Sequence, residues 1–253
     1  MSRIRHFIGF ESFSSETLRK MIDRAADLKG NPSSESGKLN GRTLAMIFET
    51  PSTRTRISFD VAMHQLGGHS IALSPGELQL GRGESIGDTA RVLSRYVDAV
   101  LLRTSKHESL VQLVDNSSIP IINGLTDRTH PCQLLADILT FEEHKGPING
   151  RRITWIGDGN NMAATWIQAA YKFDFSLTLA CPPEHKPEAE ILHWAQSKGA
   201  KVFTSSNIRE AAKDADCIVT DTWITMSDDP NSVKVDNLKS FQVDESIMAR
   251  ADK

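Results

Sequence analysis

Short apolar runs alternate along the chain with stretches whose apolar residues recur every three or four positions. The runs are typical of buried parallel strands, and the periodic stretches are typical of amphipathic helices. In the first part of the chain, strands are predicted at 43–48, 70–73, 99–103 and 120–123, and helices at 15–28, 52–65, 85–96, 109–116 and 131–144. Further on, strands are predicted at 152–157, 176–181, 201–204 and 217–220, and helices at 162–172, 187–198 and 208–213.

This alternation of strands and helices predicts parallel sheets with helices on both faces. A turn-rich segment, Lys-Gly-Pro-Ile-Asn-Gly at 145–150, follows the long helix 131–144 and interrupts the pattern. We therefore expect an α/β protein with two doubly wound parallel-sheet domains, at residues 1–147 and 148–253, and a cleft between them.

Composition and charge narrow the class of protein. Of 253 residues, 39% are hydrophobic and 24% are charged, and 29 basic against 32 acidic residues give a net charge of −3. These values are typical of a globular protein, and they provide no global basic field for nucleic acid. No apolar run approaches the roughly 18 residues that cross a bilayer, and the first residues contain no apolar core of a signal peptide. We expect a cytoplasmic protein that binds neither nucleic acid nor membranes.

The three cysteines, Cys132, Cys181 and Cys217, are far apart in the sequence and form no Cys-x-x-Cys pair. An odd number of widely spaced thiols favours a reducing compartment over a disulfide framework. The same spacing argues against a structural zinc site, so the sequence predicts no metal centre.

One segment, at the junction of a predicted strand and a predicted helix, reads Ser52-Thr53-Arg54-Thr55-Arg56. Ligands of open parallel sheets bind at the carboxyl ends of strands, where helix N-termini offer free N–H groups and partial positive charge. Arginines in the first helical turn oppose that dipole, and an anion between them would remove the conflict. A guanidinium also offers phosphate a planar fork of donors. We predict a phosphate site; the alternative is solvated arginines and a simple cap at Ser52.

A second helix start lies at 129–133, which reads Thr-His-Pro-Cys-Gln. Pro131 suits the first helical position, so His130 is expected at the cap and Gln133 in the first turn. Arg103 ends a predicted strand and is expected to point into the same crevice. Each feature has a plain alternative, because a histidine can simply cap a helix and a strand can simply end in arginine.

The chain contains S-T-R-T-R, L-L-R-T, H-P-C-Q, G-D-G-N-N-M and D-T-W-x-x-M in this order. In this combination, which covers essentially the whole chain, it resembles ornithine carbamoyltransferases. The broader family includes aspartate carbamoyltransferases, which share the first motif and H-P-x-Q, whereas Asp-Thr-Trp resembles the ornithine branch. The resemblance implies a first domain that binds carbamoyl phosphate and a second that binds L-ornithine. It also implies a cytoplasmic homotrimer, a role in arginine biosynthesis, and no metal or organic cofactor.

The resemblance also assigns site residues. Those expected to contact carbamoyl phosphate are Ser52, Thr53, Arg54, Thr55, Gln79, Arg103, His130 and Gln133, with Gln79 reaching from a neighbouring subunit. Those expected to contact ornithine are Asn161, Asp221, Thr225 and Met226. Carbamoyl transfer needs no nucleophilic side chain, but the oxyanion and the departing phosphate must be stabilised. Arg103, His130 and Thr55 are expected to serve the oxyanion. Without the resemblance, Asp221 could equally be a turn-forming aspartate.

Two departures from the family pattern alter these expectations. Where the ornithine branch has Ser-Met-Gly, this chain has Thr225-Met226-Ser227. The family continues into a strand that carries His-Cys-Leu-Pro, whereas this sequence stops at Lys253 and has no such motif elsewhere. We therefore expect a second domain that is incomplete at its C-terminus, weak or moderate binding of carbamoyl phosphate, and poor turnover.

Three alternative functions stay open at this point. One is a non-catalytic homologue that keeps carbamoyl phosphate binding, and another is an aspartate carbamoyltransferase. The third is a dinucleotide-binding oxidoreductase, because Gly157-Asp158-Gly159 follows a predicted strand. Met162 replaces the third glycine of that fingerprint, and no acidic residue ends the strand 176–181, so this third alternative is weak.

Overall fold

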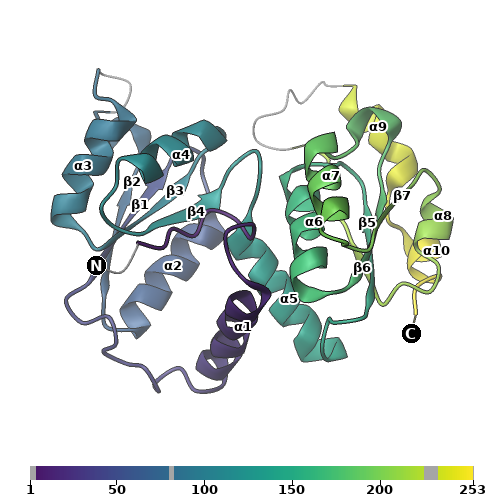
Figure 1. Cartoon of the computed structure of the whole chain (residues 1–253), viewed down its shortest axis with the longest axis horizontal. Helices are drawn as coiled ribbons and strands as arrows, with labels where there is room; N and C mark the ends of the chain where they lie inside the picture. The colour runs from purple at the N-terminus through teal and green to yellow at the C-terminus, as the bar shows by residue number, and fades with distance from the viewer. Residues whose placement is uncertain (1–3, 80–82, 225–232, 253) are drawn as a thin grey trace. The chain divides into compact units, whose positions relative to one another are not determined.

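The structure is a computed structural model, and it describes residues 4–79, 83–224 and 233–252. The chain forms two compact units (Figure 1). The first comprises Met1–Gly9 and Asp23–Cys132, and the second comprises Phe10–Ile22 and Gln133–Lys253. Helices α1 (Ser15–Gly30) and α5 (Pro131–Lys145) are each divided between the two units.

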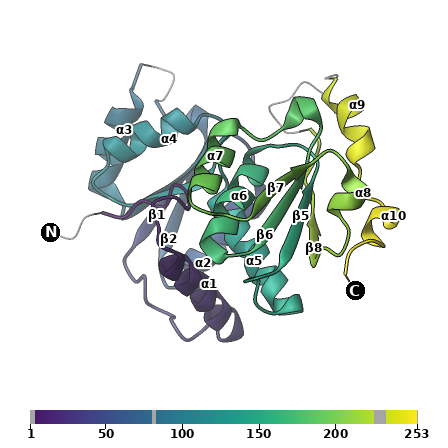
Figure 2. The ribbon, with the colours of Figure 1, turned by 45° about the vertical axis from the view of Figure 1, so that its right-hand side comes forward.

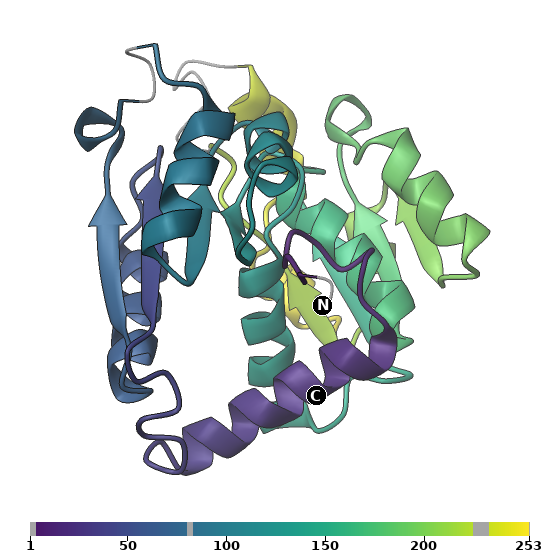
Figure 3. The same cartoon turned by 60° about the vertical axis from the view of Figure 1, so that its left-hand side comes forward.

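The first unit contains a four-stranded parallel sheet in the order β2-β1-β3-β4. Its strands are β1 (Thr43–Phe48), β2 (His69–Leu73), β3 (Ala99–Arg103) and β4 (Ile121–Leu125). Its other elements are α2 (Thr53–Gln65), the 3₁₀ turn η1 (Pro75–Glu77), α3 (Ile86–Tyr96) and α4 (His107–Asp115). Figure 3 shows the arrows of β1 and β2 pointing the same way.

Side chains of β1 and β3 alternate between two apolar layers, because successive residues of a strand face opposite sides of the sheet. One layer packs with α3 and α4 and includes Ala45, Ile47, Ala90, Val100, Leu102, Leu110 and Leu113. The other packs with α2 and consists of Leu44, Met46, Met63 and Leu101. The chain leaves β1 towards β2 and leaves the neighbouring β3 towards β4. The topological switch point, where ligands of such sheets bind, therefore lies at the carboxyl ends of β1 and β3.

The second unit repeats this plan with the strand order β7-β6-β5-β8. Its strands are β5 (Arg152–Ile156), β6 (Ser176–Ala180), β7 (Val202–Ser205) and β8 (Cys217–Val219). Its helical elements are α6 (Asn161–Phe173), η2 (Pro183–His185), α7 (Ala189–Ser197), α8 (Ile208–Ala211), α9 (Lys234–Leu238), η3 (Lys239–Phe241) and α10 (Glu245–Met248). Figure 2 shows α6 and α7 on one side of this sheet and α8 and α10 on the other. Here the switch point lies between β5 and β8.

The predicted α/β class with parallel sheets is confirmed. β1 and β3 have the predicted bounds, whereas the helix predicted at 187–198 begins at Ala189, because η2 and an extended segment precede it. The short elements α9, η3 and α10 were not predicted. The cleft and the domain boundary at 147/148 stay predictions.

Within the described residues, no helix is long and apolar enough to span a membrane. The same part of the chain contains no group of three or more His, Cys, Asp and Glu side chains that is arranged to hold a metal ion.

Candidate functional site

The N-terminus of α2 presents hydroxyl and guanidinium side chains at the carboxyl end of β1. Ser52 is the N-cap residue, with an extended backbone (φ −156°, ψ 110°), and its Oγ accepts a hydrogen bond from the Thr55 N–H at 3.3 Å. The first turn of this fully described helix contains no acidic residue. Thr53 and Arg54 are exposed, and Ser52 and Thr55 are half-buried. The first turn thus keeps the donors and positive charge that attract an anion.

Arg103 lies beside this helix start, because its Cα pairs with that of Phe48 at the end of β1. The Arg103 carbonyl accepts a hydrogen bond from the Glu49 N–H at 2.9 Å. Burial lowers the pKa of the Arg103 guanidinium, and the positive charge of Arg54 lowers it further. No described residue accepts a hydrogen bond from the buried Arg103 Nε. A buried charged donor without an acceptor is costly, so an anionic ligand at this position would be stabilising.

His130 is buried, with 8% of its surface exposed. Burial lowers the pKa of its imidazole to about 4, and the charge of Arg103 acts in the same direction. The side chain is therefore neutral at pH 7, and a neutral imidazole can donate one N–H to a carbonyl oxygen. The preceding loop is held by Asn123, whose amide donates to the Ile8 carbonyl at 2.9 Å and to Thr129 Oγ1 at 3.1 Å. This network holds Thr129, the residue directly before His130.

Gln79 and Gln133, which are also predicted to contact carbamoyl phosphate, lie in different environments. Gln79 is exposed in the loop after η1. Gln133 lies in the first turn of α5 and donates from Nε2 to Asp137 Oδ1 at 2.8 Å. Their roles stay predictions.

A second cluster lies in the other unit, where β5 and β8 end. Asn160 caps α6, because its Oδ1 accepts from the N–H groups of Met162 and Ala163 at 2.9 and 3.2 Å. Its Nδ2 donates to Asp221 Oδ2 at 3.2 Å. Asp221 follows β8, and its other carboxylate oxygen accepts from the Thr222 N–H at 2.8 Å. The carboxylate is thus held in place with partial burial.

The residue predicted at this cluster was Asn161 and not Asn160. In the structure, Asn161 is the first residue of α6, and Asn160 is the residue that bonds Asp221. With the helix predicted at 162–172, the Asn directly before it was Asn161; α6 begins one residue earlier, so the N-cap, a position that favours Asn, is Asn160. Two further predicted residues, Thr225 and Met226, lie outside the described residues.

The electrostatics of the second cluster favour a cation. Burial raises the pKa of the Asp137 carboxyl, and the negative charge of Asp221 raises it further. Two carboxylates that repel each other are stabilised by a positively charged ligand. The two clusters are therefore opposite in character: one suits an anion, and the other suits an ammonium group.

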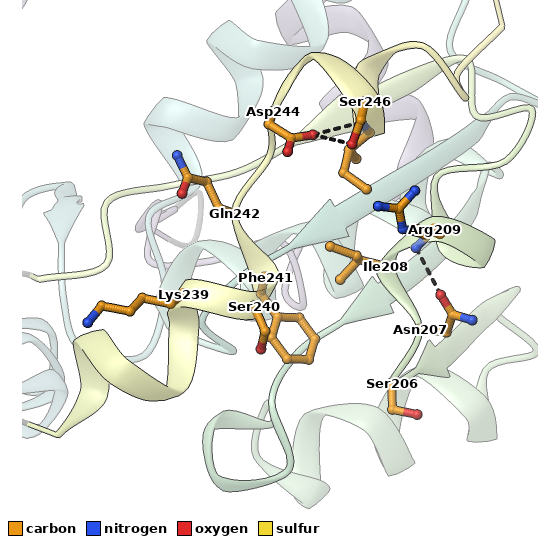
Figure 4. Close-up of a pocket in the computed structure, with 11 residues that line it drawn as sticks. Ser206, Asn207, Ile208, Arg209, Lys239, Ser240, Phe241, Gln242, Asp244 and Ser246 are labelled. Carbon is orange, nitrogen blue, oxygen red and sulfur yellow. Dashed lines mark hydrogen bonds between the residues drawn. The ribbon is translucent and has the colours of Figure 1, made fainter.

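An open pocket of about 460 Å³ lies elsewhere in the second unit, lined by residues 206–209 and by residues of the segment 239–247 (Figure 4). It contains none of the predicted site residues. Its most polar lining groups serve local structure: Asn207 Oδ1 accepts from the Arg209 N–H at 3.0 Å, and Asp244 Oδ1 accepts from Ser246 Oγ at 2.7 Å. We therefore place one candidate site at each of the two strand-end clusters and none in this pocket.

Comparison with known proteins agrees with the division into two clusters. Residues 5–143 match the family model for the aspartate/ornithine carbamoyltransferase carbamoyl-P binding domain. Residues 149–253 match the model for the Asp/Orn binding domain of the same family. The anion-attracting cluster falls within the first match, and the cluster around Asp221 falls within the second.

Several relatives are similar over nearly all of the chain. An ornithine carbamoyltransferase of Rhodopseudomonas palustris (strain BisA53) is 48% identical over 98% of this chain and 81% of that protein. One of Agrobacterium fabrum is 44% identical over 100% of this chain and 84% of that protein. Among solved structures, the anabolic ornithine carbamoyltransferase of Campylobacter jejuni has a TM-score of 0.93 and 38% identity, covering 99% of this chain and 84% of that one. The enzyme of Pyrococcus furiosus has a TM-score of 0.91 and 37% identity, covering 98% and 82%.

Proposed function

The chain belongs to the aspartate/ornithine carbamoyltransferase family, and from this premise we propose the reaction that its own residues support. It transfers the carbamoyl group of carbamoyl phosphate to the side-chain amine of L-ornithine and releases L-citrulline and phosphate. The observation that carries the proposal is the cationic cluster of Arg54 and Arg103 beside the neutral His130, at the switch point of the first sheet.

In the proposed chemistry this cluster stabilises two negatively charged groups, the phosphate of the substrate and the oxyanion that develops on its carbonyl oxygen. The phosphate of carbamoyl phosphate accepts from the first-turn N–H groups of α2, from Thr53 and from Arg54. The carbonyl oxygen faces Arg103, His130 and Thr55, which stabilise the oxyanion that develops when the neutral amine attacks the carbonyl carbon. The new C–N bond forms, the bond between the carbonyl carbon and the phosphate oxygen breaks, and the proton that the amine loses is taken up by the departing phosphate. No covalent bond to the protein is required.

The cluster around Asp221 supports ornithine over aspartate as the acceptor. Its carboxylates, Asp221 and Asp137, attract the α-ammonium group of an amino acid and repel a second substrate carboxylate. Aspartate carries that extra carboxylate, whereas ornithine carries a second amine. We accordingly propose that Asp221, Asn161, Thr225 and Met226 contact ornithine, with Asn160 as a further member of the site.

A direct assay separates these functions. We expect citrulline from carbamoyl phosphate and L-ornithine, and little carbamoyl-aspartate when L-aspartate replaces ornithine. Faster carbamoylation of aspartate would contradict the choice of acceptor. A chain that binds carbamoyl phosphate but transfers to neither amino acid would instead support the non-catalytic alternative.

The surface of the first unit supports a proposed homotrimer. Strand β2 is at the edge of the sheet. Large apolar side chains are exposed on α2, β2 and α3, and these are Ile57, Val61, Ile71, Val92 and Tyr96. Exposed apolar groups of this kind mark protein–protein interfaces. Light scattering during gel filtration is expected to give three times the chain mass, and Val61→Glu is expected to lower it. A monomeric unaltered chain would contradict the trimer and the predicted reach of Gln79 into a neighbouring subunit.

We further propose that the enzyme acts in the cytoplasm in arginine biosynthesis. An arginine-requiring bacterial strain without ornithine carbamoyltransferase is expected to grow without arginine when it expresses this protein. Continued arginine dependence, with the protein present and folded, would contradict that role.

A further inference from the structure

A buried ionic cluster lies beside the candidate acceptor residues and has no part in the mechanism described above. Asp158 Oδ2 is 2.8 Å from Nζ of Lys234, and Asp158 Oδ1 is 3.9 Å from Nδ1 of His185. The side chains of Asp158 and Lys234 are only 11% and 15% exposed. Asn237 Nδ2 lies 3.3 Å from the other ring nitrogen of His185. The cost of removing both charges from water offsets most of their attraction, so this ion pair contributes little net stability. Its effect is therefore expected on the position of the loop that carries Asp158.

The backbone around Asp158 is held from several sides. The Trp155 indole N–H donates to the Asp158 carbonyl at 2.9 Å, and the Gly159 N–H donates to the His185 carbonyl at 2.8 Å. A Cβ at Gly159 would lie 2.2 Å from the backbone nitrogen of Pro187, so only glycine allows this close approach. The loop between β5 and α6 is therefore packed directly against the segment after η2, with the Asp158 carboxylate directed to Lys234.

Asn160 comes two residues after Asp158 and connects this loop to the cluster around Asp221. Its Oδ1 caps α6, and its Nδ2 donates to Asp221 at 3.2 Å. The amide can do both only in one orientation, which depends on the path of the loop. Lys234 also compensates the charge of Asp158, so that Asp158 does not compete with Asp221 for a cationic ligand.

We infer that Lys234 and Asp158 are positioning residues for the amino-acid acceptor: their ion pair fixes the β5–α6 loop so that Asn160 orients the Asp221 carboxylate. The inference rests on the proposed function, in which Asp221 binds the amino-acid acceptor. Neither residue is required to touch the substrate.

The test compares Lys234→Met with Lys234→Arg in the full chain. We expect Lys234→Met to raise the KM for ornithine about tenfold, because a misoriented Asp221 would lose one charge-assisted hydrogen bond to the ammonium group of ornithine. The dissociation constant of phosphonoacetamide, a stable analogue of carbamoyl phosphate, should change less than about twofold, because its site lies in the first unit. Lys234→Arg keeps the charge and should restore most of the ornithine KM. Lys201→Met, which removes the exposed ion pair between Lys201 and Asp174, is the matched control and should behave as the unaltered chain.

Asp158→Asn provides a second route if Lys234→Met does not fold. It keeps the shape of the side chain, removes the buried charge, and is expected to raise the KM for ornithine in the same way. An active, folded chain whose ornithine KM is unchanged by both substitutions would overturn this inference alone. Equal losses for ornithine and phosphonoacetamide would also overturn it, because they indicate a general structural effect. An unaltered chain that does not carbamoylate ornithine would overturn the proposed function, and this inference with it.

Discussion

At the scale of single residues, the first cluster of the candidate site brings together two positive charges, those of Arg54 and Arg103, and no described residue accepts a hydrogen bond from Arg103 Nε. Burial and the positive charge of Arg54 lower the pKa of the Arg103 guanidinium, and burial and the charge of Arg103 lower the pKa of His130, which is therefore neutral at pH 7. The sequence predicted that these residues converge, because Arg103 ends a strand and the other two begin helices beside the same sheet. It could not predict that Asn160 bonds Asp221 or that Asp158 pairs with Lys234, because these contacts join residues 61 and 76 positions apart (221 − 160 and 234 − 158).

The pKa of His130 predicts how stability depends on pH. Its folded value of about 4 lies below the ordinary 6.5, so between these values the unfolded chain binds a proton that the folded chain does not. This stabilisation is complete above the unfolded pKa and is lost as the pH falls towards 4. We expect His130 to account for about 2 kcal/mol of the fall in unfolding free energy between pH 7 and pH 5. Urea unfolding at both pH values measures it, and an unchanged pH slope in His130→Asn would contradict it.

At the scale of elements, the strongest predictions came from apolar runs with clear ends. β1 lies between polar residues and was located without error, and the cap at Ser52 marked the start of α2. The region after residue 232 forms only short helical elements, α9, η3 and α10. Few apolar positions, such as Leu238, Phe241 and Ile247, anchor them to the second unit. Their short length leaves no helical period to recognise, so tertiary packing rather than sequence pattern determines them.

The cap at Ser52 is expected to have a role that an ordinary cap lacks. Ser52→Ala should lower the unfolding free energy by about 1 kcal/mol and also weaken carbamoyl phosphate binding. Ser14→Ala is the matched control, because Ser14 Oγ accepts from the Thr17 N–H at 3.1 Å at the start of α1, in the other unit. It should cause a similar loss of stability with unchanged binding. Calorimetry and thermal unfolding measure both quantities, and equal binding by the two variants would show that Ser52 is only a cap.

The β5–α6 loop should not tolerate a side chain at Gly159. Because a Cβ there would overlap the backbone of Pro187, Gly159→Ala should lower the unfolding free energy by about 3 kcal/mol or more. Gly30→Ala is the control, since a Cβ at the end of α1 has no heavy atom within 4 Å. Urea unfolding compares the two, and similar stabilities would contradict the close approach.

At the scale of the whole molecule, two units with similar topology carry ligand clusters of opposite electrostatic character. Phosphonoacetamide alone is expected to slow hydrogen exchange mainly in the first unit, at residues 50–56 and 126–130. A bisubstrate analogue, in which the phosphonoacetyl group is joined to L-ornithine, should add protection at 157–161 and 220–224. Mass spectrometry of peptides from both units measures this. Protection of the second unit by phosphonoacetamide alone, equal to that by the bisubstrate analogue, would contradict the division of roles.

The central claim is that a phosphate-bearing substrate binds where α2 begins, held by Arg54 among the first-turn donors. Isothermal titration of the folded chain with carbamoyl phosphate tests it most directly, with Arg54→Ala as the variant and Arg250→Ala, an exposed arginine of the second unit, as the control. We predict saturable binding by the unaltered chain and by Arg250→Ala, and affinity reduced about tenfold or more by Arg54→Ala. No binding by the unaltered chain, or the same dissociation constant for all three proteins, would contradict the claim.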